Sequence, residues 1–196
     1  MIYNCLHLVS VQLNLFLMKA FRQKEQKAIL GTIVNEEGEV PEENRNKVVL
    51  SLVNMEWENT RSRAISYVPR GKRELQKLNE PYNFNLDILV TSLFTDYAES
   101  LKFLSETVYF FQAHNLFDHE NTPGLSPKVD QLTFELVRLN YFETHNLWQS
   151  LGAKYMPSVL FKMRMLSFQD SEGVTTYRVL DPEADVEQRP PDLYKK

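Results

Sequence analysis

Histidine and carboxylate residues near one predicted helix end are the first candidates for chemistry in this chain. His114 and His119 are close in sequence, and Asp118 and Glu120 flank the second of them. Imidazole and carboxylate groups are common ligands of zinc. The spacing matches no familiar ligand pattern, however, and a histidine at a helix C-terminus is favoured by the helix dipole alone. We therefore expect neither a metal site nor a cofactor.

Nucleophiles and acid–base pairs have equally little support. The single cysteine, Cys5, lies among apolar residues of a helical pattern, which favours a buried, inert thiol. Asp87 falls on the polar side of a predicted strand and Asp96 precedes a predicted helix, and neither has a carboxylate partner nearby in sequence. The six glycines never cluster, which excludes a phosphate loop and a dinucleotide fingerprint. The sequence thus predicts a protein that is not an enzyme.

The composition is that of an acidic globular protein. The chain has 196 residues and a net charge of -4, which suits one domain and argues against a general nucleic-acid binder. Polar residues interrupt the apolar run Ile2–Met18, and the first basic residue is Lys19. This pattern fits neither a signal peptide nor a membrane span, so we expect a cytosolic protein without contact to membrane.

Apolar residues at helical spacing predict a helix at the N-terminus that is apolar on two faces. One stripe comprises Ile2, Leu6, Val9, Leu13, Phe16 or Leu17, and Ala20, and the second comprises Leu8, Val11, Leu15 and Met18. A helix apolar on two faces is either deeply buried or shared with another subunit. Both readings stay open on sequence alone.

The remaining elements follow from alternation and turn residues. Strands are predicted at 28–34, 47–58, 82–94, 133–142, 158–169 and 174–179, the last two joined as a hairpin, and helices at 95–114 and 143–151. The central helix has Asp96 as its predicted cap and a core stripe of Tyr97, Leu101, Leu104, Val108 and Phe111, widened by Phe103 and Phe110. In the strand 82–94, apolar Phe84, Leu86, Ile88 and Val90 alternate with Asn85, Asp87, Leu89 and Thr91, which predicts one buried and one half-polar face.

This order predicts an α+β fold. We expect a single domain with a mixed, mostly antiparallel sheet of about four to six strands. The N-terminal helix, a long central helix and a short third helix would pack the sheet. The domain is predicted over 1–180, followed by a tail at 181–196 that is rich in proline and charge and ordered only if a partner holds it.

A basic connection separates two of the predicted strands. Residues 59–80 show no clear period, and loops this long inside a domain are usually functional or disordered. Their basic residues are Arg61, Arg63, Arg70, Lys72, Arg73 and Lys77, opposed by Glu74 alone between 61 and 77. A solvated loop and a site that docks on an acidic protein surface both fit. Aromatic residues are too sparse, with Tyr67 alone inside it, to favour nucleic acid.

Residues 146–159 read as a short helix, a glycine stop, an aromatic residue, a proline and a strand. A helix this short is stable only when it packs. Trp148 is therefore either a core residue or, together with Tyr155 and Met156, a contact to a neighbouring subunit, where such residues are enriched.

Four segments together carry a resemblance to one protein family. They are KVVLSLVNME at 47–56, AESLKFLS at 98–105, LTFEL at 132–136, and NLWQSLGAKYMPSV at 146–159. The chain resembles the tail-terminator, or cap, proteins of bacterial extracellular contractile injection systems of the antifeeding-prophage and Photorhabdus virulence-cassette type. The resemblance covers about residues 3–168, and the last segment is its most specific part.

The resemblance implies a structural function without catalysis. Such caps form a six-fold ring that closes the baseplate-distal end of the inner tube and sheath, stops polymerisation and stabilises the extended sheath. The implied partners are further copies of the chain in a homohexamer, the inner tube protein and the sheath protein, with assembly in the cytoplasm before the protein becomes part of the particle. The family defines no catalytic residues that could be carried over.

Two alternatives stand beside this reading. The chain could be another component of the same particle, such as a neck, adaptor or baseplate protein, or a small hydrolase that uses Asp87 or the region of His114 and His119. The residues predicted to contact a neighbouring subunit, tube or sheath are Trp148, Tyr155, Met156, Arg61, Arg63, Arg70, Lys72 and Arg73.

Overall fold

The structure, a computed structural model, describes residues 1–58, 66–69, 74–78, 82–168 and 174–177. The chain divides into two compact units. The first comprises Met1–Thr60 and Tyr82–Ser167, and the second comprises Arg61–Pro81 and Phe168–Lys196. Among the described residues, no helix has both the length and the apolar character needed to span a lipid bilayer.

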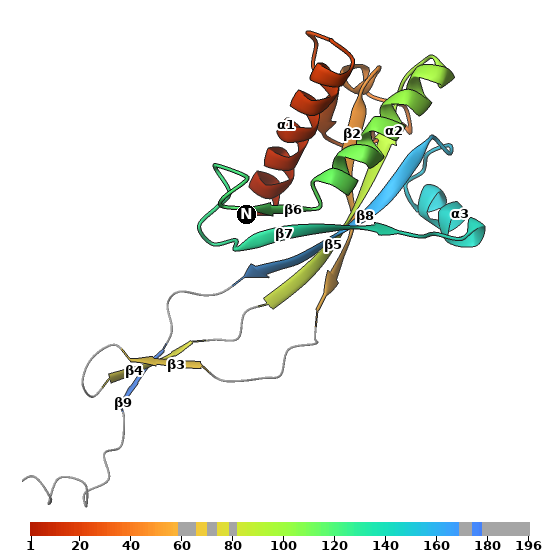
Figure 1. Cartoon of the computed structure of the whole chain (residues 1–196). Helices are drawn as coiled ribbons and strands as arrows, with labels where there is room; N and C mark the ends of the chain where they lie inside the picture. Colours follow the sequence, from red (N-terminus) through yellow and green to blue (C-terminus); the bar gives the residue numbers. More distant parts are fainter. Residues whose placement is uncertain (59–65, 70–73, 79–81, 169–173, 178–196) are drawn as a thin grey trace, which may run out of the picture. The chain divides into compact units, whose positions relative to one another are not determined.

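A six-stranded sheet forms the centre of the first unit, in the order β1-β2-β5-β8-β7-β6 (Figure 1). Its strands are β1 (Ala28–Leu30), β2 (Val48–Trp57), β5 (Tyr82–Ser92), β6 (Leu116–Asp118), β7 (Gln131–Val137) and β8 (Ser158–Phe168). β1 pairs with β2 in parallel, whereas β2 with β5, β6 with β7, and β7 with β8 are antiparallel. The amide of Ser92 donates to the carbonyl of Pro157 at 2.9 Å, so the end of β5 lies beside the start of β8. The predicted α+β fold with a mixed, mostly antiparallel sheet is confirmed.

Two long helices cover one face of this sheet. Helices α1 (Ile2–Ala20) and α2 (Tyr97–Ala113) lie side by side (Figure 1), and their aromatic rings meet. The ring centroids of Phe16 and Phe110 are 5.3 Å apart, and those of Phe21 and Phe103 are 4.0 Å apart. Burial of such aromatic pairs is a major source of stability in a domain of this size.

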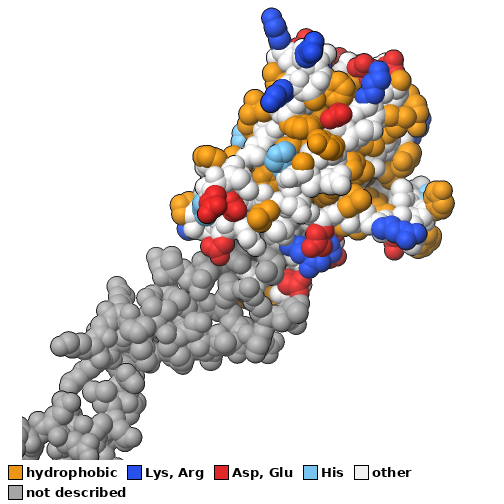
Figure 2. Space-filling model, in the orientation of Figure 1, with side chains coloured by type: hydrophobic (Ala, Val, Ile, Leu, Met, Phe, Trp, Pro, Cys, Tyr) orange, Lys and Arg blue, Asp and Glu red, His pale blue; other side chains and the backbone are white. Residues whose placement is uncertain are grey.

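The two apolar stripes of α1 have different fates. The buried residues of α1 are Cys5, Leu6, Val9, Ser10, Leu13 and Leu17. In the second stripe, Leu15 is 60% exposed and Val11 also faces solvent. Hydrophobic side chains are accordingly visible on the surface over α1 and α2 (Figure 2). Most of the first stripe is thus core, whereas in the second Val11 and Leu15 are exposed and Leu8 and Met18 are half-buried.

The predicted core stripe of α2 is confirmed in part, since Phe103, Phe110 and Phe111 are buried. Tyr97 is 67% exposed and Leu101 is also exposed, whereas the buried residues are Ser100, Phe103, Thr107, Phe110 and Phe111. Two small polar residues lie on the packed face because their hydroxyl groups are satisfied there. Ser100 and Ser92 exchange hydroxyl-to-carbonyl hydrogen bonds of 2.8 and 2.9 Å, and the Thr107 hydroxyl donates to the carbonyl of Phe103 at 2.8 Å. An apolar pattern alone could not reveal this face.

The N-cap of α2 is as predicted. The carboxylate of Asp96 accepts hydrogen bonds from the amides of Ala98 at 2.7 Å and Glu99 at 3.2 Å. Replacing Asp96 with alanine should lower the free energy of unfolding by about 1 kcal/mol, because two amides of the first turn lose their acceptor. Urea unfolding monitored by circular dichroism measures this loss. Asp96→Asn keeps an acceptor and is the matched control; equal losses in both variants would show that the acceptor oxygen is not the cause of the loss.

The other face of the sheet carries the third helix, α3 (Tyr141–Ser150). Side chains of a strand alternate between faces, so Leu89 of β5 points away from its neighbours Ile88 and Val90 and contributes to the core beneath α3. The predicted alternation of β5 is confirmed, but its half-polar face is buried as well: Asn83, Asn85, Asp87 and Thr91 are all under one-tenth exposed. The start of β2 is buried on both faces.

Several predicted bounds need correction. The strand expected at 28–34 ends at Leu30. The next carbonyl, that of Gly31, accepts a hydrogen bond from the hydroxyl of Ser51 at 2.6 Å instead of from a neighbouring strand's amide. The strand expected at 133–142 ends at Val137, because Asn140 caps α3. β6 was not predicted, since three residues between a helix end and a loop give no readable alternation.

The second unit contains a three-stranded antiparallel sheet in the order β3-β4-β9. Its strands are β3 (Ser66–Pro69), β4 (Glu74–Leu78) and β9 (Val174–Tyr177). The prediction of 59–80 as a structureless connection is therefore wrong for β3 and β4. The predicted hairpin between 158–169 and 174–179 is also wrong, because β9 pairs with β4. Residues 178–196 lie outside the described residues, so the tail at 181–196 stays a prediction.

Candidate functional site

Helix α3 is held at both ends by its own sequence. The amide of Glu143 donates to the Asn140 side chain at 2.9 Å, and the Glu143 carboxylate accepts from the Asn140 amide at 2.8 Å, which is a capping box. At the other end Gly152 has φ +65°. Its amide donates to the carbonyl of Gln149 at 3.1 Å, and the amide of Ala153 donates to that of Trp148 at 3.3 Å. This Schellman motif satisfies carbonyl groups of the last turn and so ends a helix of only ten residues.

The glycine stop is the most local test of this geometry. A Cβ atom at Gly152 would meet nothing within 4 Å, so only the left-handed backbone resists a side chain. Gly152→Ala should lower the free energy of unfolding by about 1 kcal/mol. Gly152→Asn should lose clearly less, since asparagine tolerates this conformation. Thermal melts of both variants give the comparison, and an alanine variant as stable as the parent would contradict the assignment.

A groove runs along one face of α3. Its volume is about 1130 Å³. The lining comes from α3 and the segments before and after it: Arg138, Leu139, Asn140, Tyr141, Thr144, His145, Trp148, Gln149, Gly152, Ala153, Lys154 and Tyr155. The helical members recur at three- and four-residue spacing, so they share one face of α3. We call these residues the α3 groove.

Exposed apolar side chains border the α3 groove. Tyr141 is 97% exposed, Phe142 73%, Leu136 64% and Tyr155 65%. The part of the molecule that carries α3 shows hydrophobic, basic and histidine side chains on one surface (Figure 2). Exposed apolar groups of this kind, bordered by polar residues, mark interaction sites more often than chance.

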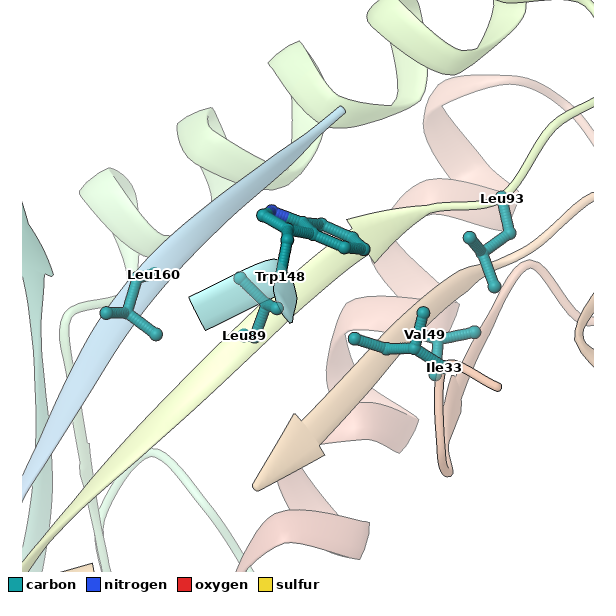
Figure 3. Packing of buried hydrophobic residues seen from close by; sticks show 6 residues of the cluster. All are labelled: Ile33, Val49, Leu89, Leu93, Trp148 and Leu160. Carbon is teal, nitrogen blue, oxygen red and sulfur yellow. The ribbon is translucent and has the colours of Figure 1, made fainter. Parts of the chain in front are cut away.

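Trp148 forms the floor of the groove. It is 4% exposed and belongs to a core cluster with Ile33, Val49, Leu89, Leu93 and Leu160 (Figure 3). Of the two predicted alternatives, the structure of the subunit thus shows Trp148 as a core residue. The Tyr155 ring and the Trp148 indole form a T-shaped pair with centroids 5.7 Å apart, and Tyr155 stays exposed. Met156 is partly buried against the same cluster. Any contact of Tyr155 or Met156 with a neighbouring subunit stays a prediction.

Asp87 belongs to a structural ion cluster on the sheet face that carries α3. Its Oδ2 accepts from the Asn54 side chain at 3.0 Å, and its Oδ1 lies 3.8 Å from the Lys162 ammonium. Lys162 also binds Glu56 at 2.6 Å. This hydrogen bond to Glu56 is the main cause that raises the pKa of Lys162, and partial burial opposes it. The single Lys162 ammonium thus partly offsets the charge of two carboxylates.

The histidine and carboxylate group near the end of α2 has local structural partners. His114 lies with its Nδ1 3.1 Å from the carbonyl of Phe110 and stacks on the Phe110 ring. The Asp118 carboxylate accepts from the amides of Glu120 and Asn121, both at 2.9 Å. Within the part of the chain that the structure describes, no three His, Cys, Asp or Glu side chains come together as possible metal ligands.

Cys5 is 1% exposed on α1. Burial raises the pKa of its thiol, an effect that the N-terminal amino group partly offsets. A raised pKa lowers the thiolate fraction at any given pH, and burial blocks access, so Ellman's reagent should react at least about a hundredfold more slowly with the native than with the guanidinium-unfolded chain. Equal rates in both states would mean that α1 does not cover this thiol.

The predicted basic contacts cannot be placed. Arg61, Arg63, Arg70, Lys72 and Arg73 lie outside the described residues. Their part in contacts with tube or sheath stays a prediction.

A family model described as the Pvc16 N-terminal domain matches residues 9–180. The chain belongs to this family. The match includes all of the described sheet and helices except the first residues of α1. No curated protein matches the chain.

Two solved structures share the fold of this Pvc16 N-terminal domain. One is the PVC sheath/tube terminator of an extracellular contractile injection system in its extended state, with TM-score 0.54, 13% identity, and coverage of 84% of this chain and 57% of that chain. The other is the tube-terminating cap of the anti-feeding prophage, with TM-score 0.53, 15% identity, and coverage of 88% and 60%. The chain therefore spans about three fifths of the length of these two proteins.

Most of the α3 groove of this Pvc16 domain was missed by sequence reasoning. Trp148 and Tyr155 were predicted interface residues, but Arg138, His145 and Lys154 were not. The helical spacing of Tyr141, Thr144, His145 and Trp148 was a readable signal. The flanking cations had none, since only the turn after Gly152 brings Lys154 back to this face.

Proposed function

We propose that this chain is the subunit of a ring that caps the baseplate-distal end of the inner tube and sheath of a contractile injection system. In this role it terminates polymerisation and stabilises the extended sheath. The chain acts by binding the ends of the tube and sheath rather than by catalysis, and it needs no cofactor.

One observation carries the proposal: the chain matches the Pvc16 family over residues 9–180, and its fold is that of two terminator caps. One of these two proteins is a sheath/tube terminator and the other is a tube-terminating cap. Because the sequence identity to these two proteins is low, the similarity to them establishes only a shared fold. The function is therefore inferred from the family and the fold together.

The exposed apolar side chains suit a ring subunit. A ring needs two different surfaces on each copy that join head to tail and close by rotation. Large exposed hydrophobic residues gather on three separate parts of the first unit: Tyr141, Phe142 and Leu136 near α3; Tyr97, Leu101 and Tyr109 on α2; and Leu52, Met55 and Trp57 on β2. These groups supply more than one candidate contact surface.

The partners follow from the role. They are further copies of the chain in a homohexamer, the inner tube protein and the sheath protein, with no nucleic acid and no membrane. Assembly in the cytoplasm would precede incorporation in the extracellular particle. Tyr155, Met156 and the basic residues of 61–73 are the candidate contacts, and Trp148 would support them from the core.

Labelling of assembled particles tests the place of the protein. Gold label on a tagged chain should mark one end of each particle, the end opposite the baseplate. Label at the baseplate, or along the sheath, would favour the alternative of another particle component. The geometry gives no reason to propose a hydrolase, because Asp87 is held by Lys162 and Asn54.

A further inference from the structure

The α3 groove is basic although the chain is acidic. Its charged or titratable lining residues are Arg138, Lys154 and His145, and no Asp or Glu lines it. Among the described residues, no carboxylate forms an ion pair with Arg138 or Lys154, and both are exposed. The aromatic residues Tyr141, Trp148 and Tyr155 belong to the same lining. Such a groove suits a ligand that is acidic on one side and apolar on the other.

The sequence contains one segment with this pattern. Residues 181–188 read Asp-Pro-Glu-Ala-Asp-Val-Glu-Gln, so an acidic residue occupies every second position from Asp181 to Glu187. Proline, alanine and valine occupy the positions between them. In an extended peptide successive side chains point to opposite sides, so the carboxylates would share one edge and the small apolar side chains the other. The segment holds four acidic residues and no basic one.

We propose that the α3 groove binds residues 181–188 of a neighbouring copy of the chain. The carboxylate edge faces Arg138, His145 and Lys154, and the Pro182, Ala184 and Val186 edge lies on the aromatic floor. Proline suits such a site because its fixed φ restricts the free peptide, so that less conformational entropy is lost on docking. The choice of a neighbouring copy rests on the proposed ring, which sets copies side by side.

Charge decides between this segment and the other basic or apolar parts of the chain. The connection 61–77 carries basic residues and would be repelled by the groove. The exposed apolar stripe of α1 has no carboxylates to pair with Arg138 or Lys154. The family match ends at residue 180, so the proposed occupant is a feature of this chain rather than of the matched domain.

Disulfide cross-linking of the full chain tests the proposal. In a Cys5→Ala background, Gln149→Cys places a thiol in the groove and Ala184→Cys places one in the segment. Lys102→Cys with Ala184→Cys is the matched control, because Lys102 is exposed on α2 and does not line the groove. Mild oxidation should link the groove pair into covalent dimers and larger species about tenfold faster than the control pair, as expected for a bound rather than a free segment.

Two further arms make the result specific. Adding Arg138→Glu and Lys154→Glu should reduce the rate to that of the control, and circular dichroism verifies the fold of each variant. In the groove pair that keeps Arg138 and Lys154, a synthetic peptide of residues 181–188 should slow the cross-link. The same peptide with all four carboxylates replaced by amides should not. If the groove pair links no faster than the control, or only within one chain, the proposal is overturned.

Native mass spectrometry separates this outcome from that of the proposed function. A ring that forms without the groove cross-link overturns the docking and leaves the cap proposal standing. Covalent dimers that depend on Arg138 and Lys154 but never enter a ring support the docking and contradict the cap.

Discussion

Trp148→Ala is expected to lower the free energy of unfolding by about 3–5 kcal/mol, the range found when a buried large aromatic side chain is truncated. The indole is 4% exposed and packs on residues from β2, β5 and β8, so its removal leaves a cavity beneath α3. A helix of ten residues cannot persist without such packing. Urea unfolding followed by far-ultraviolet circular dichroism gives the loss directly.

Tyr141→Ala is the matched control for Trp148→Ala. It truncates an aromatic residue of the same helix, but this side chain is 97% exposed, so the expected change is under about 0.5 kcal/mol. If Trp148→Ala were as stable as Tyr141→Ala while ring assembly failed, the tryptophan would be an interface residue and its place in the core cluster would be wrong.

Phe111→Ala is expected to have an effect of similar size on the opposite face of the sheet, about 3–5 kcal/mol. The ring of Phe111 is 2% exposed, and its centroid lies 4.4 Å from that of Phe161 and 5.0 Å from that of Phe134. It therefore joins α2 to both β7 and β8. Removing it loses contacts to two strands at once.

Tyr109→Ala provides the comparison for Phe111→Ala. Tyr109 lies two positions earlier on α2 and is 59% exposed, so its truncation should cost under about 0.5 kcal/mol. Chemical unfolding of the two variants in parallel measures the difference. Equal stabilities would mean that α2 presents a different face to the sheet.

Local features were readable from the sequence because their causes are local. Asp96 before an apolar helix, and a glycine after Leu151, act through hydrogen bonds within a few residues. The two-residue alternation of β5 likewise identified which side chains share a face. These signals do not depend on the rest of the fold, so tertiary structure did not override them.

Features set by distant partners were not readable. β9 pairs with β4 rather than with β8, a choice between strands nearly a hundred residues apart in sequence. The packed face of α2 contains Ser100 because its hydroxyl donates to the carbonyl of Ser92 at the end of β5. Neither partner could be chosen from sequence pattern alone.

The α3 groove shows the same limit for the site. The motif at 146–159 predicted the helix, its stop and the aromatic residues, but not the surface that they would form. Arg138 comes from the segment between β7 and α3, and Lys154 from the turn before β8, which returns to the groove after the chain turns at Gly152. Sequence reasoning weighted the basic connection at 61–73 instead, since clustered charges are more visible than dispersed ones.

The growth of inner tubes in the presence of the purified chain tests the cap function most directly. Tube protein is polymerised with and without the chain at a low molar ratio, and tube lengths are measured by electron microscopy. Shorter tubes are expected, each with a ring of the chain at a single end. Unchanged tube lengths, with the folded chain present and tube ends free, would contradict the cap function.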